Sequence, residues 1–282
     1  MISSNSSIFM LERIKRPPMF QMEANHMHDY YELYYLLSGT RKYFIHHSFY
    51  TLHPHDMMLI QKGELHRTTY LSSSPHERTV LYFDDTWLQP LIACYGKDAI
   101  LQCFSSPKLS IPVSKQDYLD DLLLRMNVEY QSKDIFSDRL LYNLFEELII
   151  FLIRCREQQT EAYNYSQEAD ADISRAARYI CENFHKDISL EYVAEISNLS
   201  PTYFSKKFKQ TTGFGYKEYV NHIRLKEATR LLDETMESIT TIAMQCGFND
   251  SNYFGDVFKK TYGISPRTYR KKNLTLTSSL PK

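Results

Sequence analysis

The sequence lacks the marks of a secreted, membrane-embedded or disulfide-stabilised protein. Its N-terminal stretch, MISSNSSIFMLERIKR, has no apolar core of the kind found in secretory signals. The longest strongly apolar run, residues 148–153, is far too short to cross a bilayer. The 5 cysteines are odd in number and none has CxxC spacing, which argues against a disulfide framework or a structural zinc cluster. We therefore expect a cytoplasmic protein without a membrane partner and without a cofactor.

Length and composition describe an ordinary globular chain with room for two domains. The 282 residues are 43% hydrophobic and 24% charged, with a formal net charge of −1. This near-neutral total conceals a division, because residues 171–282 carry 17 Lys and Arg against 12 Asp and Glu, whereas the preceding residues carry 16 against 22. A basic C-terminal part suits a polyanion such as DNA, which would repel the acidic remainder.

The C-terminal third contains an internal repeat. The pattern Tyr203-Phe204, Phe208-Lys209 and Gly213 recurs 50 positions later as Tyr253-Phe254, Phe258-Lys259 and Gly263. Each copy predicts two short helices joined by a tight turn. In the first copy Ser200 can cap a helix that begins at Pro201, and in the second Gly247 ends one helix before the next begins near Ser251. A connecting helix over residues 216–233 is expected to bury the apolar faces of both pairs.

Two helices joined in this way can place the second helix in the major groove of double-stranded DNA. A connecting helix of about 18 residues at ~1.5 Å each spans roughly 27 Å, close to the ~34 Å of one DNA turn, so one chain could contact two successive groove segments. The outward positions of the two reading helices are expected to be Thr202, Ser205, Lys206, Lys209, Ser251, Asn252, Gly255, Asp256 and Lys259. Phosphate contacts are expected from Lys206, Lys207, Lys209, Lys259, Lys260, Arg267, Arg270, Lys271 and Lys272.

Two stretches of this region resemble the AraC-type transcription regulators. The run GFNDSNYFGDVFKKTYGISPRTYRKK, residues 247–272, is similar to their signature, and residues 189–213 resemble their first helix-turn-helix. The resemblance covers about a hundred residues and implies a transcription activator that contacts RNA polymerase. One departure concerns the second reading helix, because such regulators often have Ser-Arg where Gly255 and Asp256 stand here. A generic helical interaction domain, with the aromatic repeat serving only as core, is the alternative.

The N-terminal part changes to short strand-like runs. Between residues 28 and 83, runs rich in Tyr, Ile, Leu and Phe alternate with turn residues, which favours an antiparallel barrel or a double-sheet jelly roll. His26, His28, Glu32 and His66 have the order and spacing of the two cupin motifs. Residues 20–85 thus resemble cupins and also the effector domain of AraC-type regulators.

The cupin-like residues admit three interpretations. His26, His28, Glu32 and His66 could hold Zn, Mn, Fe or Ni in a metal-dependent enzyme or a metal-responsive regulator. They could instead hydrogen-bond a sugar or a similar polar effector, or simply lie at the surface. For an effector pocket without metal the candidates are His28, Glu32, Tyr34, Arg41, Tyr43 and His66, on positions expected to face inward.

The middle of the chain predicts helices and then a linker. Residues 111–157 contain two apolar stripes at helical spacing, and the family resemblance implies that this segment forms a homodimer. We thus divide the chain into a cupin-like effector domain (1–110), a helical segment (111–157), a linker (158–172) and a DNA-binding domain (173–275). The fold class is α+β in two domains, and the expected function is a DNA-binding transcription regulator, not an enzyme, that responds to a small molecule such as a sugar.

Overall fold

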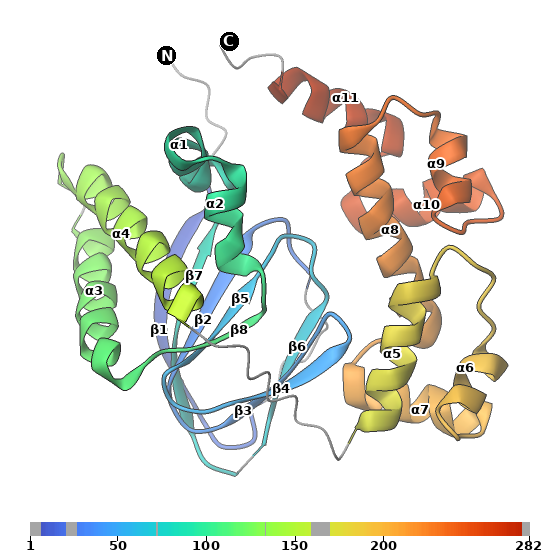
Figure 1. The fold of residues 1–282 in the computed structure, drawn as a ribbon, viewed down its shortest axis with the longest axis horizontal. Helices are drawn as coiled ribbons and strands as arrows, with labels where there is room; N and C mark the ends of the chain where they lie inside the picture. Colours follow the sequence, from blue (N-terminus) through green and yellow to red (C-terminus); the bar gives the residue numbers. More distant parts are fainter. Residues whose placement is uncertain (1–6, 21–26, 72, 133, 159–169, 278–282) are drawn as a thin grey trace. The chain divides into compact units, whose positions relative to one another are not determined.

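A computed structural model describes residues 7–277 except 21–26, 72, 133 and 159–169. The chain divides into two compact units, residues 1–167 and 168–282, and each is described by itself (Figure 1). Most of the predicted linker, 158–172, lies outside the described residues. None of the described helices combines the length and the hydropathy that a membrane span requires.

The N-terminal unit contains two antiparallel sheets. The larger sheet has the strand order β1-β7-β2-β5-β8 and the smaller has the order β4-β3-β6. Their bounds are β1 Phe9–Arg16, β2 Tyr31–Ser38, β3 Arg41–Ile45, β4 Ser48–Leu52, β5 Asp56–Ile60, β6 His66–Tyr70, β7 His76–Phe83 and β8 Lys108–Ser110. The predicted α+β class with an antiparallel N-terminal domain is confirmed. The edge strands β1 and β8 were not predicted.

Helices cover one face of the larger sheet (Figure 1). They are α1 Asp85–Tyr95, α2 Lys97–Leu101, α3 Val113–Gln131 and α4 Ser137–Gln158, with the short 3-10 helix η1 Gln102–Phe104. Phe145 of α4 is fully buried against the sheet, with its ring centroid 4.8 Å from that of Phe83 on β7. The opposite face of the larger sheet packs on the smaller sheet through a second apolar cluster that includes Tyr34, Tyr43 and Val80.

The C-terminal unit is entirely helical where it is described. Its helices are α5 Ala171–Asn183, α6 Leu190–Ile196, α7 Pro201–Thr212, α8 Tyr216–Glu234, α9 Ile239–Gln245, α10 Ser251–Tyr262 and α11 Pro266–Thr277. The helix α8 supplies core residues to both repeat copies. Its Tyr219 ring lies 5.4 Å from Phe208 of α7, whereas Leu225 and Leu232 belong to the cluster that contains Phe254 and Phe258 of α10.

Candidate effector site and nucleic-acid interface

The space between the two sheets holds a group of buried polar side chains. Glu32 and Tyr34 of β2 face Arg41 and Tyr43 of β3, and each of the four is at most 4% exposed. His66, at the start of β6, is completely buried. The alternation of β2 and β3 therefore points the predicted side chains into this space, because successive strand residues face opposite sides.

At one end of this space, the Glu32 carboxylate lies beside two histidines. Its Oε2 atom lies 3.0 Å from Nε2 of His28 and 3.3 Å from Nε2 of His66. Burial raises the pKa of Glu32, but the two histidines outweigh it and hold the pKa at about 2. For His66 burial lowers the pKa, and Glu32 outweighs burial and raises it. The Glu32 carboxyl is therefore ionised at neutral pH.

The same three side chains also fit a divalent metal ion. One donor atom from each of His28, Glu32 and His66 lies within 4.8 Å of the other two. The Nδ1 atoms face the backbone carbonyls of Tyr30 and Glu64, at 2.8 Å and 2.9 Å. An N–H held on a carbonyl leaves Nε2 for a ligand, as in many metal-binding histidines. The fourth predicted metal ligand, His26, lies outside the described residues.

Cationic side chains lie at the other end of the same space. Of these, the sequence predicts only Arg41 as a site residue. Arg78 and His76 of β7 are both buried, and Nη1 of Arg78 donates to Nε2 of His76 at 2.9 Å. Arg41 donates from Nη1 to the carbonyl of Phe20 at 2.7 Å and from Nε to the hydroxyl of Thr68 at 3.2 Å. Buried arginines are rare, so neither composition nor alternation indicates them.

The buried His76 is expected to make the stability of the folded protein sensitive to acid. Burial lowers its pKa to about 4, and Arg41, Arg78 and Arg16 lower it too, so the ring is neutral when folded. Because its ordinary pKa is 6.5, its contribution to stability is present above pH 6.5 and is lost as the pH falls toward 4. We expect the unliganded protein to lose about 1–3 kcal/mol over this interval, measured by urea unfolding at several pH values.

His76→Gln is the matched variant, because an amide oxygen can accept from Arg78 but does not titrate. The pH dependence between 6.5 and 4.5 should flatten in this variant. His66 does not interfere, since a raised pKa makes its contribution constant below 6.5, and Glu32 loses its contribution only below 4.5. An unchanged slope would show that His76 is not the group that titrates.

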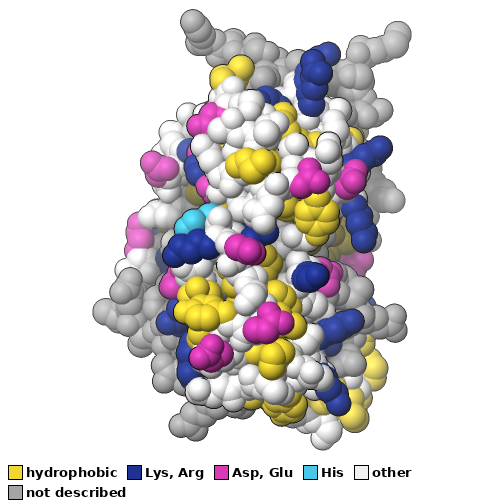
Figure 2. Space-filling view, turned by 90° about the vertical axis from the view of Figure 1, so that its right-hand side faces the viewer, with side chains coloured by type: hydrophobic (Ala, Val, Ile, Leu, Met, Phe, Trp, Pro, Cys, Tyr) yellow, Lys and Arg dark blue, Asp and Glu magenta, His cyan; other side chains and the backbone are white. Residues whose placement is uncertain are grey.

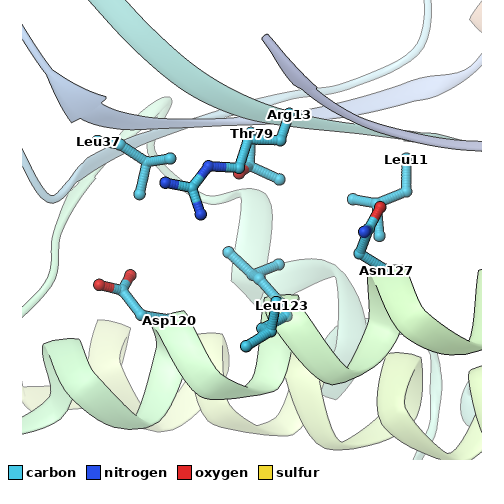
Figure 3. Close-up of a pocket in the computed structure, with 8 residues that line it drawn as sticks. Leu11, Arg13, Leu37, Thr79, Asp120, Leu123 and Asn127 are labelled. Carbon is cyan, nitrogen blue, oxygen red and sulfur yellow. The ribbon is translucent and has the colours of Figure 1, made fainter. Parts of the chain in front are cut away.

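A separate cavity of about 110 Å³ lies between the larger sheet and α3 (Figure 3). Figure 3 shows Leu11, Leu37 and Leu123 around it, with Arg13 and Asp120 pointing toward it from opposite sides. Ligand pockets usually have volumes of roughly 300–1,000 Å³. This cavity is too small for a typical effector and contains none of the predicted effector residues.

In the C-terminal unit the two repeat copies form matching turns. Asn198 and Gly247 both adopt positive φ, at 55° and 85°. The next residue in each turn donates its N–H back to the preceding helix, from Leu199 to the carbonyl of Ala194 and from Phe248 to that of Ala243, both at 2.9 Å. Asn and Gly are the residues that adopt this left-handed conformation most readily. The two copies of the sequence repeat therefore form the same turn, with the same backbone hydrogen bond.

The second helix of each copy exposes most of its predicted reading residues. On α7 Thr202, Lys206 and Lys209 are exposed and Ser205 is half-buried, while on α10 Asn252, Asp256, Lys259 and Lys260 are exposed and Ser251 is half-buried. Lys207 differs from Lys206, because its Nζ atom lies 2.5 Å from Oδ2 of Asp172. Phe204, Phe208, Phe254 and Phe258 turn inward and are fully buried. Each reading helix therefore has an aromatic inner side and a polar outer side.

The two arginines of α11 that are predicted to contact phosphate differ in exposure. Arg267 is exposed, whereas Arg270 is half-buried and donates from Nη1 to the carbonyl of Glu237 at 2.6 Å. Arg270 thus ties α11 to the segment before α9 and is less available to a phosphate. On the face that Figure 2 displays, Lys and Arg are interspersed with Asp, Glu and apolar side chains, so this face offers no continuous basic surface.

Two family models match the chain. One, described as an AraC-like ligand binding domain, matches residues 12–149, and the other, described as a helix-turn-helix domain, matches residues 193–272. Among curated relatives, the HTH-type transcriptional activator RhaR of Mannheimia succiniciproducens is 25% identical over 96% of this chain and 94% of its own length. The regulatory protein PocR of Salmonella typhimurium is 37% identical over 46% of this chain and 44% of its own length.

Solved structures give weaker matches. ToxT from Vibrio cholerae, in its apo form, aligns over 95% of this chain and 98% of its own, with 16% identity and a TM-score of 0.42. The DNA-binding domain of AdpA, in complex with a target DNA, aligns over 37% of this chain and 95% of its own, with 24% identity and a TM-score of 0.36. Neither score is high enough to add to the family matches.

Proposed function

The chain belongs to the AraC-type transcription regulators, with an AraC-like ligand-binding domain and a helix-turn-helix domain, and we propose that a small effector bound between its two sheets controls promoter binding. The observation that carries this proposal is the buried polar group of Glu32, His66, Tyr34 and Arg41. Buried polar atoms lower the stability of a fold unless they form hydrogen bonds, so their presence in an otherwise apolar core favours recognition of a ligand. The effector would act by preferring one arrangement of the dimer on DNA over another.

We propose that the functional form is a homodimer joined through α3 and α4. In support, Val113, Leu124 and Val128 of α3 are more than half exposed, which is unusual for several large apolar side chains on one helix. The dimer would activate transcription by contacting RNA polymerase at the promoter, as the family implies. Action on the chromosome would place the protein in the cytoplasm.

DNA binding is tested through Lys206. Genomic fragments retained by the purified full chain identify a target, and the affinity of Lys206→Ala for that fragment is then measured against salt concentration. We expect weaker binding because Lys206 is exposed on the side of α7 that is predicted to face DNA. If Lys206 contacts a phosphate, the affinity should fall equally for all DNA sequences, and the slope of log affinity against log salt concentration should be smaller by about 1. If it contacts a base, the binding free energy should fall by about 1–3 kcal/mol at specific sites only.

Lys207→Ala is the matched control for this experiment. Lys207 is adjacent in the sequence, but its ammonium group pairs with Asp172. Its removal is expected to change DNA affinity much less than removal of Lys206. Equal losses in the two variants would mean that α7 does not present the predicted side to DNA.

A metal-responsive regulator is the second candidate, favoured by the convergence of His28, Glu32 and His66. A bound ion would supply a fixed positive charge that links β2 to β6. In that case elemental analysis of protein purified without chelator should find about one transition-metal ion per chain, lost in His66→Ala. A wild-type protein that holds no ion, even after incubation with Zn²⁺ or Mn²⁺, would leave only the polar effector pocket.

A further inference from the structure

Three arginines, Arg41, Arg78 and Arg16, lie around His76 without a carboxylate partner among the described residues. Arg41 of β3 is 1% exposed and Arg78 of β7 is 9% exposed, while Arg16 at the end of β1 is half-buried. Burial lowers the pKa of Arg41 and the neighbouring Arg78 lowers it further, so the two guanidinium groups repel each other. An arginine cannot escape this repulsion by losing its proton near neutral pH.

Several polar atoms of this group are buried without a hydrogen bond in the part of the chain that the structure describes. They are Nε of Arg16, Nη2 of Arg41, Nε of Arg78 and the hydroxyl of Tyr34. The hydrogen bonds that Arg41 and Arg78 do make end on neutral acceptors, namely the carbonyl of Phe20, the hydroxyl of Thr68 and the ring of His76. Neutral acceptors satisfy single donors but do not compensate the charge.

Aromatic rings provide the remaining contacts. The Arg78 guanidinium lies 5.2 Å from the ring centroid of Tyr34 and 5.8 Å from that of Phe20, and Arg16 lies 4.8 Å from Phe20. Such contacts stabilise a cation only modestly, whereas burying an unpaired ion costs considerably more. The balance favours an anion between the guanidinium groups, where charge-assisted and bidentate hydrogen bonds are strongest.

Building on the proposed effector function, we infer that the effector is a small anion, and that Arg41 and Arg78 bind its carboxylate or phosphate group between the two sheets. The opposite end of the same space is formed by the Glu32 carboxylate, which would repel an anion and accept hydrogen bonds from hydroxyl groups. Tyr34 and Tyr43 lie between these ends, with ring centroids 5.1 Å apart. The matching ligand is a hydroxylated acid or phosphate ester, such as a sugar acid or a sugar phosphate, and not a neutral sugar.

The test measures ligand binding to the full chain at constant ionic strength. The probes are D-gluconate and D-glucuronate for carboxylates, D-glucose 6-phosphate for phosphate esters, inorganic phosphate, and D-glucose as the neutral counterpart. At 10 mM we expect at least one anionic probe to raise the melting temperature by several degrees while glucose does not, because binding to the native state alone is stabilising. The carboxylate and phosphate arms separate the two sources of negative charge.

Methionine variants then assign the site. Arg41→Met and Arg78→Met should each weaken the binding of the responsive probe by roughly 30-fold or more, as expected when a partner of a buried charge is removed. Arg13→Met is the control, because Arg13 lies on the neighbouring strand β1 with its side chain 60% exposed and paired to Glu77 at 2.7 Å. This control should bind the probe as the wild type does.

The unliganded variants give an independent readout. Removing a buried charge that lacks a partner should leave the melting temperature of Arg78→Met equal to or above that of the wild type. A fall of several degrees would assign Arg78 a structural role and overturn the inference. It would also be overturned if no anionic probe, inorganic phosphate included, stabilised the wild type, if glucose stabilised it equally, or if both variants kept wild-type affinity. Retained binding to genomic target fragments in those cases would leave the regulator function standing, whereas absent DNA binding by the wild type would remove that function instead.

Discussion

Phe204→Ala is expected to destabilise the helical unit by roughly 3–5 kcal/mol, the usual cost of removing a fully buried phenylalanine. Phe204 has no exposed surface, and its ring lies 5.3 Å from that of Phe208 and 6.2 Å from that of Tyr216. The cavity left behind would lie between α7 and α8. Since domains are commonly stable by only about 5–15 kcal/mol, such a loss would populate unfolded forms and weaken DNA binding.

Hydrogen exchange measured by mass spectrometry on the full chain can localise this effect. A loss of that size should speed exchange of the most protected amides of α7 and α8 by about two to three and a half orders of magnitude, because each 1.4 kcal/mol is tenfold. Tyr203→Ala is the matched control, since Tyr203 is adjacent but 55% exposed. Its cost should be within about 0.5 kcal/mol. Similar costs in the two variants would contradict the burial of the aromatic pair.

Gly247→Ala is expected to cost roughly 2–5 kcal/mol by combining backbone strain with a steric conflict. Gly247 has a φ of 85°, a region that side chains rarely adopt, and an added Cβ would lie 2.5 Å from the carbonyl oxygen of Phe184 and 3.0 Å from the backbone of His185. The turn between α9 and α10 would have to move away from the end of α5. Chemical unfolding of the variant should show the loss, with DNA affinity falling in parallel.

Gly263→Ala separates the two causes of that loss. Gly263 also has positive φ, at 75°, but an added Cβ would meet nothing within 4 Å. Its cost should therefore reflect the strain alone, about 1 kcal/mol. If Gly247→Ala costs no more than Gly263→Ala, the close approach to Phe184 does not constrain the turn.

The helix-turn-helix repeat was predictable because its determinants are local. Ser200 accepts a hydrogen bond from the N–H of Tyr203, and Asp250 accepts one from the N–H of Asn252, so both reading helices begin where capping rules place them. Gly213 and Gly263 end these helices in the left-handed conformation. The family, the two-domain α+β class and the role as a DNA-binding regulator are confirmed by the matching family models. The individual DNA contacts stay predictions.

The effector site could be predicted only in part. Strand alternation placed Glu32, Tyr34, Arg41 and Tyr43 on inward positions, and the structure places them there. Whether they bind an effector stays a prediction. His76 and Arg78 could not be found in this way, because their burial depends on β7 pairing with β2 across a shift between Leu36 and Ser38. Such pairings join distant segments, and no local pattern specifies them.

The helix α8 contributes to both aromatic cores, while the exposed side chains of α7 and α10 lie outside them. We therefore expect substitutions on these exposed sides to leave the separation of α7 and α10 unchanged, because buried residues of α8 determine that separation. If Thr202 and Asn252 contact bases as predicted, single substitutions at either position should give new operator preferences in an unchanged scaffold. A substitution at Leu225 or Tyr219 would instead alter the geometry of the whole domain at once, and selection should tolerate it far less.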